Sequence, residues 1–197
     1  MQYTWLGHST FLITNDAGGR LVTDPADERT SPNQPHVTAD VITVSHRHFD
    51  HCAVERIGGC PVVKESLAGE TLAGFTITGF PTFHDEVKGA KRGTNTIFSI
   101  EADGERYVHC GDLGHMPDER TIATLKGCDV LFLPVGGIFT VDGALAWEIA
   151  KRIAPKSVVP MHFQTPDLGF RLEPLANFLN AAKADPAPIA IEVPSRK

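Results

Sequence analysis

The 197-residue chain lacks the patterns that mark several large classes of protein. No apolar run approaches the roughly 18 residues that a membrane span requires. The first residues, MQYTWLGHST, contain neither the basic region nor the apolar stretch of a secretory signal. The net charge is −6 and no long Lys/Arg run is present, so a nucleic-acid partner is not expected. These absences favour a cytoplasmic protein that does not span a membrane.

Several catalytic signatures are also missing. The sequence has no G-x-S-x-G motif of a serine hydrolase, no glycine-rich phosphate loop ending in Gly-Lys-Ser/Thr, and no C-x-x-C pair. We expect the four cysteines to be reduced and mostly buried, because a chain with 42% hydrophobic residues does not need disulfides to hold its core. Catalysis by a serine or cysteine nucleophile therefore has little support.

What the sequence does contain is a series of short strand-like runs separated by turn-forming residues. We predict strands within residues 2–6, 10–14, 20–24, 40–45, 61–65, 75–80, 96–103, 105–110, 129–134, 156–162 and 187–193. Helical patterns occupy residues 116–127, 140–155 and 171–185, and a short helix is expected at Asp50–Arg56. Neither a linker nor a long repeat is visible, so residues 1–197 are expected to form one α+β domain, with two sheets and helices outside them.

The most informative stretch is VITVSHRHFDH, residues 41–51. His46 and His48 follow an apolar strand and are two residues apart, and in extended backbone such side chains project to the same side. Asp50 and His51 come where the chain turns, so they project in another direction. This division predicts two adjacent metal sites, and imidazole with carboxylate suits zinc, manganese or iron. The competing interpretation, an exposed polar turn with accidental histidines, is disfavoured by the regular spacing.

A site for two metal ions needs ligands from elsewhere in the chain. Three candidates stand where a predicted strand runs into a loop: His84 in PTFHDE, Asp112 in CGDLG and His162 in VVPMHF. A carboxylate can bridge two cations, and the glycines beside Asp112 would allow the backbone to approach closely.

H-x-H-x-D-H, a later histidine, Gly-Asp after a strand and a final histidine together resemble the metallo-β-lactamase superfamily. The stretches WLGHSTFLI, LVTDP, NTIFSIEADGERYVHCGDLGH and LPVGG are similar to its UPF0173 or lactonase-like branch, which is akin to the ascorbate-6-phosphate lactonases. The resemblance covers nearly the whole chain. It implies a four-layered αββα sandwich with the metals at one edge, between the sheets.

The resemblance also implies a set of metal ligands. These are His46, His48 and His84 for one ion, Asp50, His51 and His162 for the other, and Asp112 as a bridge. His109 competes with His84 for the third position. His109 lies inside a predicted strand and only three residues before Asp112, so it cannot easily reach the same metal from another side. This favours His84.

From this resemblance we expect a hydrolase with two divalent metal ions, zinc first and manganese or iron as alternatives. The ions would lower the pKa of a shared water, and Asp50 is the expected proton acceptor. The expected substrate is a small ester, lactone or phosphodiester, and an anionic one because positive charge would remain at the centre. The alternative is a non-catalytic metal-binding or interaction protein on the same fold. The sequence is also compatible with a homo-oligomer.

Five further residues are weaker candidates for orienting a ligand or contacting substrate. His8 and Asp24 could each orient a metal ligand. Alternatively, His8 is a structural histidine and Asp24 is a turn residue. His115 could contact substrate. Lys91 and Arg92 could bind an anionic group, but a solvated loop is the favoured interpretation of that basic cluster, which also contains Lys88.

Overall fold

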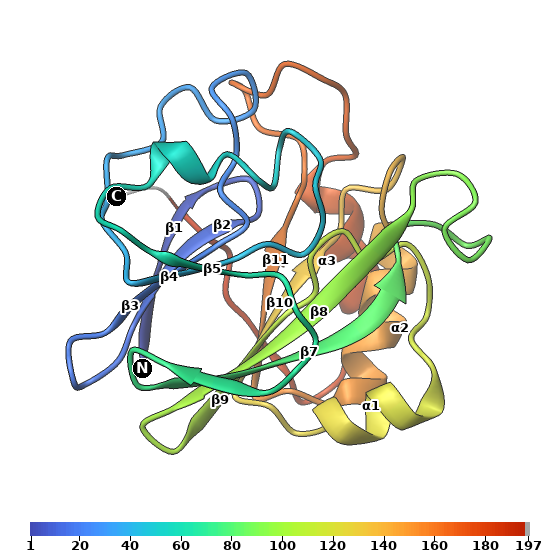
Figure 1. Ribbon diagram of the computed structural model, residues 1–197. Coiled ribbons are helices and arrows are strands. Elements are labelled where there is room, and N and C mark those ends of the chain that lie inside the picture. Colours follow the sequence, from blue (N-terminus) through green and yellow to red (C-terminus); the bar gives the residue numbers. More distant parts are fainter. Residues whose placement is uncertain (196–197) are drawn as a thin grey trace.

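A computed structural model describes residues 1–195 of the chain, and two β-sheets form its centre (Figure 1). The smaller sheet has five strands in sequence order, the first three antiparallel and the last three parallel. Its strands are β1 (Gln2–Gly7), β2 (Thr10–Thr14), β3 (Arg20–Thr23), β4 (Val41–Thr43) and β5 (Val62–Lys64).

The larger sheet has seven strands in the order β12-β11-β10-β9-β8-β7-β6. It is antiparallel from β6 to β9 and parallel from β9 to β12. Its strands are β6 (Glu70–Leu72), β7 (Phe75–Phe83), β8 (Thr94–Ala102), β9 (Glu105–His109), β10 (Val130–Pro134), β11 (Ser157–Met161) and β12 (Ala190–Ile191). The sequence predicted all of these strands except β6.

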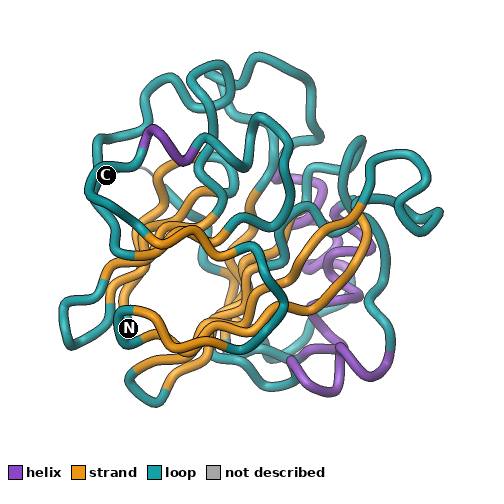
Figure 2. Tube along the Cα trace, viewed as in Figure 1, coloured by secondary structure: helices purple, strands orange, loops and turns teal. Residues whose placement is uncertain are grey.

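Three helices lie together outside the larger sheet (Figures 1 and 2). They are α1 (Glu119–Leu125), α2 (Gly143–Ile153) and α3 (Leu175–Ala184), each inside a predicted helical range. Asp118 and Asp142 are the N-caps of α1 and α2, and each side chain accepts a backbone N–H of the first turn. On α2, Trp147, Ile149 and Ile153 are buried, whereas Ala144 is exposed. No helix within residues 1–195 is long and apolar enough to cross a membrane.

The main core lies between the two sheets. Phe11 and Ile13 of β2 face Phe98 and Phe132 of the larger sheet, and all four side chains are completely buried. The rings of Phe11 and Phe132 are 4.3 Å apart between centroids, so they join the two sheets directly.

The outer face of the smaller sheet has only a thin cover. Val22 and Ile42 pack there against the segment that includes Ala39 and Ile57. The helix predicted at Asp50–Arg56 is wrong in extent, because only Val54–Arg56 forms one turn of 3-10 helix, η1. Residues 50 and 51 form a turn. The α+β fold is confirmed, with the outer layer on this side built mostly from loop.

Long loops leave the two sheets at one end of the molecule, drawn at the top of Figures 1 and 2. The predicted site residues follow the strands that run toward this end: His8 after β1, Asp24 after β3, residues 46–51 after β4, His84 after β7, Asp112 after β9 and His162 after β11. The fold therefore collects residues from distant parts of the sequence at a single sheet edge.

Candidate metal centre

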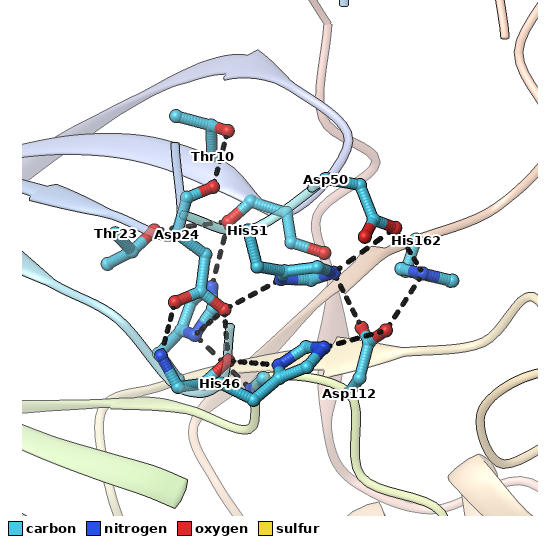
Figure 3. A network of polar contacts seen from close by, with 12 residues as sticks. Thr10, Thr23, Asp24, His46, Asp50, His51, Asp112 and His162 are labelled. Carbon is cyan, nitrogen blue, oxygen red and sulfur yellow. Dashed lines mark hydrogen bonds and ion pairs between the residues drawn. The ribbon is translucent and has the colours of Figure 1, made fainter. Parts of the chain in front are cut away.

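Asp112 contacts several histidines of the polar cluster at this edge, His46, His51 and His162 among them (Figure 3). Its two carboxylate oxygens are 3.1 Å from His51 Nε2, 3.1 Å from His84 Nε2 and 3.2 Å from His162 Nε2. His46 Nε2 is 3.8 Å away. A single buried carboxylate thus faces four imidazoles that come from three different loops.

The loop that carries Asp112 is held by tight contacts. Gly111 has φ +54, and a Cβ there would lie 2.5 Å from the Cβ of Ser45, so no larger residue fits. Asn95 Oδ1 accepts the backbone N–H of Asp112 at 2.9 Å, and Asn95 Nδ2 donates to the carbonyl of Cys110 at 2.9 Å. The close backbone approach predicted from the glycines is present.

The first group of candidate ligands is His46, His48 and His84. Their donor atoms all lie within 4.8 Å of one another. The ring of His84 is 4.7 Å from that of His46 and 5.0 Å from that of His48. His48 is exposed, whereas the other two histidines are buried. The two imidazoles predicted to project to one side therefore do converge, and His84 joins them.

The second group is Asp50, His51, His162 and, in addition, His8. Asp50 Oδ2 lies 3.6 Å from His51 Nε2, 3.7 Å from His162 Nε2 and 3.2 Å from His8 Nε2. All four side chains are buried. His46 and His48 thus belong to one group and Asp50 and His51 to another, while His46 and His51 also form a third candidate group with Asp24.

Asp24 lies behind the candidate ligands. Its Oδ1 accepts the backbone N–H of Ser45 at 2.8 Å, and its Oδ2 accepts both the Ser45 hydroxyl at 2.5 Å and His51 Nδ1–H at 2.9 Å. Because the Ser45 hydroxyl donates to Asp24, its oxygen can accept a hydrogen bond from His46 Nδ1, 3.0 Å away. Asp24 therefore directs the Nε2 atoms of His51 and His46 toward the centre, and its own oxygens are occupied.

Three residues at this edge have left-handed backbone that is uncommon for residues other than glycine: His8 at φ 51, Asp24 at φ 38 and His162 at φ 53. Such conformations cost about 1–3 kcal/mol each and persist only where the surroundings impose them. Their concentration at this edge indicates that the placement of these side chains is under strong structural constraint.

The carboxylates at the centre are held ionised. Burial alone would raise the pKa of Asp50, but the surrounding His51, His162 and His8 outweigh it and lower the pKa well below its ordinary value. Asp112 shows the same balance between burial and the imidazoles of His162 and His51. Both groups are therefore anions near neutral pH and attract cations.

The buried histidines fall into two classes, with a lowered or a raised pKa, according to the charged groups nearest to them. Burial lowers the pKa of His46 to about 3 and that of His8 to about 4, so both are neutral at pH 7. Burial also acts against charge on His51 and His162, but Asp112 and Asp50 outweigh it and raise the pKa of His162 to about 9. A cation beside these carboxylates would take the place of the protons.

The centre fits divalent metal ions in both its donor types and its unused atoms. The buried Nε2 atoms of His46, His51 and His162, together with Asp112 Oδ1, have no hydrogen-bond partner among residues 1–195. They are close to one another but are not aligned for hydrogen bonds. Buried polar atoms are rarely left in this way, whereas imidazole nitrogens and carboxylate oxygens are zinc ligands.

Two predicted site residues have other partners. His109 Nε2 meets the carbonyl of Ser9 at 2.9 Å, so of the two competing histidines it is His84 that lies against Asp112. His115 accepts the backbone N–H of Phe83 through Nε2 and donates to the carbonyl of Met116 through Nδ1, which ties its loop to the end of β7.

The two basic residues predicted as candidates after His84 lie in different surroundings. Lys91 is exposed and pairs with Glu86, away from the centre. Arg92 lines the cleft beside the candidate ligands, and its guanidinium donates to the carbonyl of Ile138 at 3.0 Å. Asp85 accepts four backbone N–H groups of residues 87–92 and so fixes the loop that carries Arg92.

A cleft of about 350 Å³ opens on the candidate centre. Five candidate ligands line it, and we call them its floor: His48, Asp50, His84, Asp112 and His162. The other lining residues form what we call its mouth: Phe49, Arg92, Phe139 and Phe170.

The sequence interpretation missed several of the residues that shape this site. Asn95 carried a weak signal as a polar residue beside the start of a predicted strand, and Asp85 carried one because it directly follows the candidate ligand His84. Phe170 had none, because a lone phenylalanine in an irregular segment is indistinguishable from a core residue. The expectation of mostly buried cysteines was wrong for Cys60, which is exposed, and Cys52 is half-buried.

Comparisons with known proteins agree with this geometry. Residues 2–162 match the family described as the β-lactamase superfamily domain. A UPF0173 metal-dependent hydrolase from Methanoculleus marisnigri is 33% identical, over 84% of this chain and 82% of the relative.

Among solved structures, a metallo-β-lactamase superfamily protein from Thermotoga maritima, assigned as a Zn-dependent hydrolase, has a TM-score of 0.78 at 31% identity and covers 98% of both chains. A metallo hydrolase from Ignicoccus hospitalis has a TM-score of 0.68 at 23% identity, covering 98% of this chain and 95% of its own, and so shares the fold.

Proposed function

The chain belongs to the metallo-β-lactamase superfamily and is a metal-dependent hydrolase, and we propose that it works with two divalent metal ions on a small, anionic ester, lactone or phosphodiester. Zinc is the first candidate, with manganese and iron as alternatives. The proposed ligands are His46, His48 and His84 for one ion, Asp50, His51 and His162 for the other, and Asp112 between them.

The convergence on Asp112 carries this proposal. One buried carboxylate, whose Oδ1 has no hydrogen-bond partner among residues 1–195, faces imidazoles of both groups: His46 and His84 of the first, and His51 and His162 of the second. A single ion would need only three or four of these seven residues. The presence of two complete groups of candidate ligands around Asp112 supports a centre with two metal ions.

When bound, two divalent ions supply Lewis acidity that brings the pKa of a water molecule toward neutrality. Asp50 is positioned to accept the proton of that water, because it lines the cleft and is ionised. His8 approaches Asp50 Oδ2 at 3.2 Å, and its low pKa keeps it a neutral hydrogen-bond donor. His8 therefore serves as a positioning residue for the Asp50 carboxylate.

Asp24 and Ser45 are positioning residues for the ligands. The Asp24 carboxylate fixes the His51 tautomer in which Nδ1 carries the proton and Nε2 is free to bind metal. Ser45 extends the same arrangement to His46.

Arg92 supports an anionic substrate, because it is the basic side chain among the residues that line the cleft. A carboxylate or phosphate group of the substrate would meet its guanidinium while the bond to be cleaved lies over the floor. The three possible bond types share attack by hydroxide on an electrophilic carbon or phosphorus.

Metal analysis combined with a substrate screen tests the proposal. The protein is purified without chelator, its metals are measured, and hydrolysis of ester, lactone and phosphodiester panels is assayed under zinc, manganese and iron. We expect about two ions per chain and turnover of at least one panel that Asp50→Ala abolishes. Fewer than one ion per chain with no hydrolysis would support a non-catalytic metal-binding or interaction protein instead.

A further inference from the structure

The mouth of the cleft differs chemically from its floor. Every floor residue is a histidine or an aspartate, whereas the mouth has three phenylalanines and one arginine. Phe49 follows β4, Phe139 follows β10 and Phe170 follows β11, so three separate loops each supply one ring. Three independent aromatic contributions at one opening point to a recognition surface.

The three rings form a connected set around Phe170. Its ring centroid is 6.1 Å from that of Phe49, at an interplanar angle of 85°, and 6.0 Å from that of Phe139, at 72°. These are edge-to-face contacts, which hold aromatic rings in defined orientations. Phe170 therefore links the two sides of the mouth.

The two outer rings are exposed yet held in place. Phe49 is 49% exposed and Phe139 is 37% exposed, which is unusual for such large apolar side chains at one place. The guanidinium of Arg29 lies 4.7 Å from the centre of the Phe49 ring, and that of Arg92 lies 5.5 Å from the centre of the Phe139 ring. Cation–π contact fixes both rings without burying them.

The size and chemistry of the cleft limit what it can hold. Its volume is near the lower end of the roughly 300–1,000 Å³ typical of small-molecule sites. Phenyl rings offer contact area and no conventional hydrogen bonds, so they favour an apolar group over a hydroxylated one. A sugar phosphate would leave its hydroxyl groups facing three phenyl rings.

We propose that the substrate carries an aromatic or branched alkyl group next to the bond that is cleaved, and that Phe49, Phe139 and Phe170 bind this group. This inference rests on the proposed hydrolase function for the reacting end of the substrate. Phe170 is the principal specificity-determining residue, because it contacts both other rings. The substrate is thus amphipathic, with the bond to be cleaved over the floor, an anionic group near Arg92 and an apolar body against the three rings of the mouth.

Two phosphonates that share one anionic head test the inference. Methylphosphonate presents the head alone, and benzylphosphonate adds a phenyl group. Their dissociation constants for the zinc-loaded protein are measured by calorimetry. We expect benzylphosphonate to bind at least about tenfold more tightly, because its ring is removed from water. Phe170→Ala should reduce that ratio to about twofold and leave the methylphosphonate constant and the zinc content unchanged, and Phe170→Leu should keep most of the ratio.

Two controls make each outcome decisive. Phe139→Ala repeats the test at a second ring, and Leu67→Ala removes an exposed apolar side chain that does not line the cleft. Equal zinc-dependent binding of both phosphonates, or a ratio that neither phenylalanine variant reduces, overturns the inference while the hydrolase proposal stands. Binding of neither phosphonate in a zinc-dependent manner contradicts the proposed metal centre, and the inference falls with it.

Discussion

The floor and the mouth of the cleft are built in different ways. The floor residues Asp50, His84, Asp112 and His162 are almost fully buried, and hydrogen bonds to His8 and Asn95 hold Asp50 and the backbone of Asp112. The mouth rings are half-buried or exposed, and each is held by ring or cation–π contacts with two or three neighbours. The centre that would activate water is therefore rigid, while the surface that would select the substrate can change with few consequences for the fold.

This difference gives the two regions separate kinetic signatures. Substitutions in the floor should reduce metal binding and kcat, whereas substitutions in the mouth should raise KM and leave the metal in place.

The largest effect is expected at Asp50. Asp50→Ala removes the proposed proton acceptor and a proposed ligand, so kcat should fall by about 10²–10⁴-fold. The measurement is steady-state kinetics on the best substrate of the screen, with metal content determined in parallel. Near-normal kcat in this variant would exclude Asp50 from proton transfer.

Asp24→Asn should have the next largest effect, although Asp24 does not line the cleft. The amide cannot fix the His51 tautomer as a carboxylate does, and such losses typically weaken metal affinity about 10–100-fold. Competition with a zinc chelator measures the affinity. Asp40→Asn is the matched control, because Asp40 also accepts a backbone N–H but is exposed and remote from the cluster. Equal zinc affinity in the two variants would show that Asp24 does not position the metal ligands.

Arg92→Gln should act on the mouth. We expect KM for an anionic substrate to rise about tenfold with little change in kcat, since one charge-assisted contact is lost. Lys91→Gln is the neighbouring control and should leave KM unchanged, because Lys91 pairs with Glu86 outside the cleft. Similar behaviour of the two variants would favour the solvated-loop interpretation of this cluster.

The smallest expected effect concerns Asp85 and the pH dependence of stability. Burial would raise its pKa, but four backbone N–H donors outweigh burial and lower the pKa from 3.8 to about 2. A group with a lowered pKa stabilises the fold above its unfolded value and loses that contribution as the pH falls through its folded value. Asp85→Asn should therefore unfold at a lower temperature than the wild type near neutral pH, and the gap should narrow as the pH falls from about 4 to about 2.

Thermal unfolding in EDTA measures this gap without interference from bound metal. A gap that stays constant over the same pH range would show that Asp85 does not stabilise the loop through its charge.

The sequence alone predicted the residues of the floor better than those of the mouth. The H-x-H-x-D-H spacing predicted two groups projecting in different directions, and the positions of His84, Asp112 and His162 at strand ends predicted that they would meet. These inferences worked because imidazole and carboxylate groups are conspicuous and strand ends converge at a sheet edge.

The mouth offered no comparable signal. Phe49 and Phe170 are 121 positions apart in the sequence, and apolar residues in loops carry no period that would show which of them face a cleft. Strand β6 was missed for a related reason, because its three residues, Glu70–Leu72, are too few to show alternation. The fold class followed from strand and helix patterns, while the thin outer layer on the smaller sheet depends on tertiary packing around Val22 and Ile42.

The central claim is that two metal ions bind on either side of Asp112. Anomalous diffraction at the zinc absorption edge, from crystals of the zinc-loaded protein, tests it most directly. We expect two peaks in each chain, one among His46, His48 and His84 and the other among Asp50, His51 and His162, with Asp112 in contact with both. A single peak, or a peak that Asp112 does not contact, would contradict it.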